Sequence, residues 1–178
     1  MRRIISVLSI MSVLMLHSCG SMMGMANSNK YGSFVKRTTN GTGGQVHYQS
    51  KNYLIRLARQ EANNEMLDEE GTREKINMVP EGGGVIIEIT NLTIELAKPE
   101  HYLYVLKDSE GEEIARKEGS ENITPDYTLL SGTTYWSATD YIRLEKSLPE
   151  GPLKFYLINK LSQKRSDFLI YPDGRPQQ

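Results

Sequence analysis

A single cysteine, Cys19, occurs among the 178 residues of this chain. One cysteine excludes an intrachain disulfide framework and any zinc site that needs several cysteines. The formal net charge is only -1, which argues against a dedicated nucleic-acid-binding protein. Long apolar runs are also missing, and the 38% hydrophobic and 24% charged residues are typical of one small globular domain.

The N-terminus combines a basic start with a short apolar segment. Met1-Arg2-Arg3 is followed by thirteen uncharged residues, Ile4 to Leu16. Thirteen residues in a helix span roughly 20 Å, which is shorter than the ~30 Å hydrocarbon layer of a bilayer. This pattern is typical of a secretory signal peptide. We therefore predict a signal peptide over residues 1–18 rather than a transmembrane helix.

The residues around the cysteine, Leu16-His17-Ser18-Cys19-Gly20, resemble the lipobox of bacterial lipoprotein precursors. The resemblance covers the first twenty residues only. It implies cleavage between Ser18 and Cys19, transfer of diacylglycerol to the Cys19 thiol, and acylation of the new amino group, for example with palmitate. The residue after the cysteine is Gly20 rather than an aspartate, which in enteric bacteria favours sorting of the lipoprotein to the outer membrane. The resemblance thus implies a cell-envelope lipoprotein held on the lipid bilayer by its acyl chains.

Residues 19–45 are rich in Gly, Ser, Asn and Thr and show neither helical nor strand periodicity. Such composition predicts a flexible, lipidated tether, which an early strand at Phe34 and Val35 would shorten. Charge is unevenly distributed here, because residues 19–60 contain six basic residues and no acid. From residue 61 onward, 13 basic residues face all 22 acids. A positive region near the anchor would be attracted to anionic lipid head groups.

Alternating apolar and polar residues predict a mainly β domain over residues 46–178. After residues 85–89, the alternation continues through Leu92, Ile94 and Leu96, but it is shifted by one residue relative to the first segment. This shift predicts a bulge or tight turn at Thr90-Asn91. Short strands with turn residues between them predict an antiparallel β-sandwich, Ig-like or C2-like. A small β-barrel is the alternative. The main strand candidates are residues 85–89, 101–107, 112–117, 135–144, 153–159 and 166–171.

Residues 53–70 fit two interpretations. Leu54, Ala58, Ala62 and Met66 recur every four residues, as on one face of a helix, whereas residues 53, 55 and 57 alternate like a strand. We favour a strand over about residues 46–59, followed by a long polar connection with room for a helical turn. A connection of that length, running through the Gly82-Gly83-Gly84 triplet, is a place where binding could reside.

Signatures of catalysis or metal binding are missing. The glycine triplet leads into a β-branched pattern rather than into the helix that a phosphate-binding loop requires. His47 and His101 are the only histidines after residue 18, and neither stands at a ligand spacing from another ligand. No Gly-x-Ser-x-Gly motif is present. We therefore predict no metal, no cofactor apart from the covalent lipid on Cys19, and no enzymatic activity.

Four aromatic residues lie within a fifteen-residue stretch: Tyr127, Tyr135, Trp136 and Tyr141. Tyrosine and tryptophan on a rigid scaffold are common in binding surfaces. The competing interpretation is that Trp136 and alternate tyrosines fill the core. We take the four residues as a candidate binding patch.

These observations lead to three functional hypotheses. The first is a non-catalytic envelope lipoprotein whose β-sandwich binds a protein or polymer of the envelope or of the cell's surroundings. The second is a structural or assembly lipoprotein of an outer-membrane or secretion complex, and a hydrolytic enzyme comes third. An exposed aromatic patch would favour the first, a flat edge strand the second, and a cleft with convergent ionisable groups the third.

Overall fold

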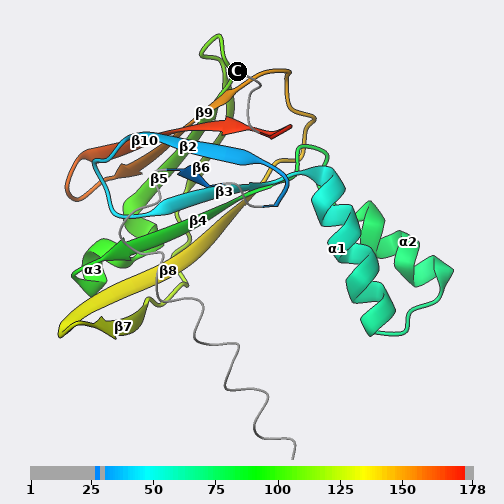
Figure 1. The fold of residues 1–178 in the computed structure, drawn as a ribbon, viewed down its shortest axis with the longest axis horizontal. Coiled ribbons are helices and arrows are strands. Elements are labelled where there is room, and N and C mark those ends of the chain that lie inside the picture. Colours follow the sequence, from blue (N-terminus) through cyan, green and yellow to red (C-terminus); the bar gives the residue numbers. More distant parts are fainter. Residues whose placement is uncertain (1–26, 29–30, 175–178) are drawn as a thin grey trace, which may run out of the picture.

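Two antiparallel sheets pack face to face in the computed structural model, which describes residues 27–28 and 31–174 (Figure 1). The six-stranded sheet has the order β1 (Asn27–Ser28), β2 (Phe34–Thr39), β10 (Lys164–Tyr171), β9 (Leu153–Asn159), β5 (Tyr102–Lys107) and β6 (Glu113–Glu118). The four-stranded sheet has the order β3 (Gln45–Gln49), β4 (Gly84–Asn91), β8 (Thr133–Arg143) and β7 (Asp126–Leu130). The described strands do not close into a barrel, so the predicted β-sandwich is confirmed.

The core lies between the two sheets and follows from the period-two pattern of their strands. In β9, every second residue from Leu153 onward is buried, and Phe155 and Leu157 are completely inaccessible. In β4, Val85, Ile87 and Ile89 are equally inaccessible. Because alternate side chains of a strand point to opposite faces, each sheet contributes one apolar face. Burial of such side chains is worth roughly 1.5–3 kcal/mol each.

A helical hairpin replaces most of the predicted strand over residues 46–59. Strand β3 ends at Gln49, and Ser50 accepts a hydrogen bond from the Tyr53 N–H at 3.2 Å, which caps α1 (Lys51–Asn64). Asp68 caps α2 (Glu69–Asn77) by accepting from the Gly71 N–H at 2.9 Å. The strand prediction was therefore wrong beyond β3. The four-residue periodicity was the informative pattern, since Ala58 and Ala62 are the buried residues of α1.

The folded part of the chain begins earlier than the predicted boundary at residue 46. Strand β2 lies within the segment predicted to be a tether, and it pairs with β10 in the six-stranded sheet. The loop after β2 is also held, because the Gly41 and Thr42 N–H groups donate to Ser166 Oγ at 3.0 and 2.9 Å. The signal peptide, the Ser18–Cys19 cleavage site and Cys19 itself lie outside the described residues.

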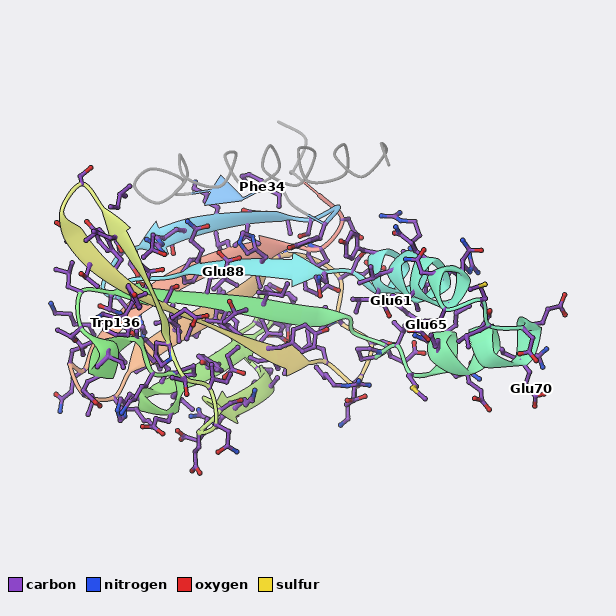
Figure 2. All side chains as sticks on the ribbon, turned by 90° about the horizontal axis from the view of Figure 1, so that it is seen from below. Phe34, Glu61, Glu65, Glu70, Glu88 and Trp136 are labelled. Carbon is purple, nitrogen blue, oxygen red and sulfur yellow. The ribbon has the colours of Figure 1, made fainter. Side chains whose placement is uncertain are left out.

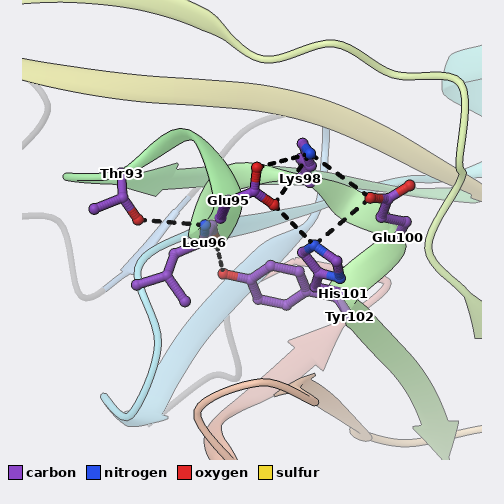
Figure 3. Close-up of polar contacts among 7 residues, drawn as sticks. All are labelled: Thr93, Glu95, Leu96, Lys98, Glu100, His101 and Tyr102. Atoms are coloured by element: carbon purple, nitrogen blue, oxygen red, sulfur yellow. Dashed lines mark hydrogen bonds and ion pairs between the residues drawn. The ribbon is translucent and has the colours of Figure 1, made fainter.

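Two short helices explain the phase slip after β4. Strand β4 ends at Asn91, and α3 (Ile94–Ala97) and a 3₁₀ turn (Pro99–His101) lead into β5. Thr93 Oγ1 accepts from the Leu96 N–H at 3.4 Å, and the Tyr102 hydroxyl donates to the Leu96 carbonyl at 2.7 Å (Figure 3). The apolar alternation after residue 91 thus belongs to a helical turn rather than to a strand.

Candidate binding surface

The aromatic stretch forms a hairpin at one end of the four-stranded sheet. Strand β7, which the sequence analysis did not predict, pairs with β8 through the two-residue turn Ser131-Gly132. Both turn residues have positive φ angles, 50° and 80°, as a type I′ turn requires. This turn connects its strands with the right-handed twist of the sheet. Figure 1 shows β7 at the sheet edge farthest from β3.

Tyr127 and Trp136 are directly opposite each other in this hairpin. Their ring centroids are 5.7 Å apart at an interplanar angle of 53°. Tyr127 is 69% exposed and Leu129, two residues along β7 on the same face, is 65% exposed. We call Tyr127, Leu129 and Trp136 the β7–β8 face. Figure 2 shows Trp136 at the end of the molecule remote from α1 and α2.

The β7–β8 face is exposed because its hairpin extends beyond the part of the four-stranded sheet that packs against the other sheet. Along the same face of β8, Thr134 is exposed, Trp136 is partly buried, and Ala138, Asp140 and Ile142 are buried. The buried end lies against the other sheet, whereas burial declines toward the turn. Tyr127 and Leu129 therefore lie outside the core, on the exposed part of this face.

The other two predicted patch residues do not join this face. Tyr135 and Tyr141 are odd-numbered positions of β8, so they project from the opposite side of the sheet. Tyr141 packs against the backbone of Gly84, where a β-carbon would lie only 1.8 Å from the tyrosine hydroxyl. Burial raises the pKa of Tyr141. The structure therefore brings together Tyr127 and Trp136 and separates them from the other two tyrosines.

A concave surface lies between the helical hairpin and the end of the four-stranded sheet. This cleft has a volume of about 550 Å³. Leu54, Leu57, Met78 and Val79 give it apolar walls, Tyr141 lies on the sheet side, and Glu61, Glu74, Lys75 and Arg143 supply its charges. The acids and bases among these charges balance, so the cleft shows no preference for a ligand of one sign. This cleft could not be expected from the sequence, because the helical hairpin that forms one of its walls was not predicted.

A partly buried ion pair between Lys117 of β6 and Asp140 of β8 connects the two sheets. The Asp140 carboxylate accepts hydrogen bonds from Lys117 Nζ at 2.9 Å, from the Ser120 N–H at 2.9 Å and from the Tyr141 N–H at 2.7 Å. Burial raises the pKa of Asp140, but these hydrogen bonds outweigh burial and hold the pKa below its usual value. Burial and the charge of Asp140 raise the pKa of the neighbouring Tyr104 phenol. This pair fixes β8 against β6.

A polar cluster next to α3 contains His101 (Figure 3). His101 Nε2 lies 3.4 Å from Glu95 Oε2 and 3.6 Å from Glu100 Oε1. Lys98 Nζ lies 2.9 Å from Glu95 Oε1, and this hydrogen bond, followed by that of His101, lowers the pKa of Glu95. Among the described residues, no group of three or more His, Cys, Asp or Glu side chains is arranged to hold a metal ion. The cluster joins α3 to β5.

Comparison with known proteins gives no relationship, since no family model, curated protein or solved structure matches this chain. Within the part of the chain that the structure describes, no helix has the length and apolar character needed to cross a bilayer.

Proposed function

We propose that this protein is a non-catalytic lipoprotein of a bacterial cell envelope, anchored in the outer membrane by acylated Cys19, whose β-sandwich binds an envelope or extracellular partner. The β7–β8 face would be the binding surface. The exposure of Tyr127 and Leu129 beside Trp136 carries the binding role, and the resemblance of Leu16-His17-Ser18-Cys19-Gly20 to a lipobox supports the anchor.

Aromatic side chains suit such a surface for energetic reasons. Tyrosine and tryptophan bury a large area on binding and lose few rotamers, which makes them the commonest residues at energetically important contacts. The type I′ turn and the pairing with β8 fix the backbone of the face before a partner arrives. A preformed surface avoids much of the entropic cost of binding.

Replacing Cys19 with alanine tests the anchor. The variant lacks the thiol that accepts diacylglycerol, so we expect it to lose palmitate labelling and to leave the membrane fraction in cells. A Ser21→Ala variant serves as a matched control and is expected to keep both properties. Continued labelling of the Cys19→Ala protein, together with its presence in washed membranes, would show that the anchor has been wrongly assigned.

A photo-crosslinking amino acid tests the binding face. Placed at Leu129 in intact cells, it is expected to give a discrete adduct with another envelope component. Leu161 is a matched control, because it is also an exposed leucine (55%) but lies outside the hairpin. A Tyr127→Ala substitution should reduce the Leu129 adduct several-fold. Equal adducts from positions 129 and 161 would contradict the assignment of the face.

The structural or assembly hypothesis is favoured by a different observation. Strand β7 is an edge strand with all but one of its residues exposed. An open edge can add a strand from another chain through backbone hydrogen bonds. The two hypotheses are compatible, since one uses side chains of the hairpin and the other uses its backbone.

A further inference from the structure

The two sheets have four edge strands, and three of them are poorly suited to pairing with another chain. Strand β1 has only two residues, and four of the six residues of β6 are charged, which protects an edge. Strand β3 is covered, because four of its five residues are buried and Ser33 Oγ donates to the Tyr48 carbonyl at 2.6 Å. Among the described edge strands of five residues or more, β7 alone is both exposed and nearly free of charge.

The hairpin geometry determines which backbone groups of β7 face the open edge. Leu130 and Thr133 flank a two-residue turn, so they form a hydrogen-bonded pair. Hydrogen-bonded and non-hydrogen-bonded pairs alternate along an antiparallel ladder, and Thr128 therefore also bonds to β8. The N–H and C=O groups of Tyr127 and Leu129 consequently point away from β8, toward the open edge.

We propose that β7 pairs antiparallel with β7 of a second copy of this chain, about a twofold axis at Thr128. In this register Tyr127 of each copy lies opposite Leu129 of the other. The outward N–H and C=O groups of both residues then form hydrogen bonds with their counterparts. The two four-stranded sheets become one continuous eight-stranded sheet.

The side chains of β7 fit this register. Tyr127 lies beside Leu129 of the second copy on one face, and such aromatic and aliphatic cross-strand pairs stabilise antiparallel sheets. On the other face, the two Thr128 side chains meet and Asp126 lies opposite Leu130 of the second copy. The charged residue of β7 therefore never faces a like charge. The same strand is complementary to itself in backbone and in side chains, as a twofold interface requires.

This pairing goes beyond the proposed function and does not depend on the anchor. It uses backbone groups and leaves the β7–β8 faces of the two copies open side by side, which doubles the surface available to a partner. Five paired residues bury less area than the ~1,200–2,000 Å² of a typical stable interface. We therefore expect a weak dimer that forms at high local concentration, such as on a membrane surface.

A Thr128→Cys variant of the full chain tests the pairing. On the twofold axis the two residues form a non-hydrogen-bonded pair with Cα atoms about 4.5 Å apart, a distance that a disulfide can span. With a mild oxidant in cells, we expect at least about fivefold more disulfide dimer than from Leu130→Cys, whose two copies are offset by four residues along the strand. The parent chain, whose only cysteine is Cys19, shows how much disulfide dimer forms through Cys19 alone. Equal yields at positions 128 and 130 would overturn the proposal.

A proline at position 129 provides a second test. It removes an outward N–H without removing a hydrogen bond to β8, and edge strands tolerate proline. Combined with Thr128→Cys, it should reduce the disulfide dimer several-fold while thermal unfolding stays close to that of the parent. An unchanged dimer yield would refute backbone pairing, and if the proline unfolds the domain the comparison of positions 128 and 130 still decides. Purified Cys19→Ala/Thr128→Cys protein has no lipid anchor, so disulfide dimers of this protein would show that the pairing does not depend on the anchor.

Discussion

Replacing Phe155 with alanine is expected to lower the free energy of unfolding by about 4 kcal/mol, because truncating a buried phenylalanine loses its transfer free energy and leaves a cavity. Phe155 is completely inaccessible in β9, with its ring centroid 6.4 Å from that of Tyr104 and 6.3 Å from that of Phe168. A chain of this length should show a melting temperature lower by about 10 °C. Chemical denaturation of the wild type and the variant measures the difference directly.

Tyr127→Ala is the matched control for this substitution. It also removes an aromatic ring from a strand, but Tyr127 is 69% exposed and contacts Trp136 outside the core. We expect it to change the free energy of unfolding by less than about 1 kcal/mol. If both variants were equally destabilised, the division between core and β7–β8 face would be incorrect.

The strands of the sandwich could be predicted from the sequence because burial on one face imposes a period of two. Leu153–Asn159 is the strand β9 that the structure contains, since three of its four inward positions carry the large apolar residues Leu153, Phe155 and Leu157. The β5–β6 hairpin was also predictable, because Asp108 supplies the turn and accepts hydrogen bonds from the N–H groups of Gly111 and Glu112 at 2.8 Å. Local chemistry and long-range packing agree in these segments.

The helical hairpin was not predicted because its sequence satisfies two periods at once. Residues 53, 55 and 57 alternate, and Leu54, Ala58 and Ala62 recur every four residues. Packing decides between the two, because Ala58 and Ala62 are the buried residues of α1, and α1 packs against α2. Ser50 and Asp68 were local signals for helix starts. Recognising them as caps would have favoured the helical interpretation.

Only part of the candidate site was predicted, because its assembly depends on a turn that was not predicted. Tyr127 and Trp136 are nine residues apart in sequence, and only the Ser131-Gly132 turn places them opposite each other. Serine followed by glycine is a recognised turn signal, and its place between two runs of β-favouring residues indicates a hairpin that includes β7. Knowledge of that register separates Tyr135 and Tyr141 from the patch, because alternate residues of β8 lie on opposite faces.

Lys117→Met is expected to destabilise the fold by about 3 kcal/mol, because it leaves the buried Asp140 carboxylate without its cationic partner. The Asp140 side chain is only 3% exposed and the Lys117 side chain 34% exposed. Lys117 Nζ also donates to Ser120 Oγ and to the Tyr141 carbonyl, at 3.1 and 2.7 Å. Methionine has a similar length and preserves the packing of the aliphatic stem, so the loss should come from the charge. Equilibrium unfolding at pH 7 measures it.

Arg116→Met is the matched control, since Arg116 is the adjacent residue of β6 but forms its ion pair with Glu113 at the surface. Exposed pairs contribute little to stability, and we expect a far smaller change than for Lys117→Met.

The pH dependence of the destabilisation by Lys117→Met separates the effect of charge from that of packing. The folded-state pKa of Asp140 lies below the ordinary value of 3.8, so its contribution is fully present above that value and is lost as the pH falls through the folded-state pKa. The difference in the free energy of unfolding between wild type and Lys117→Met should therefore become smaller below about pH 4. A difference that does not change with pH would assign the effect to packing instead.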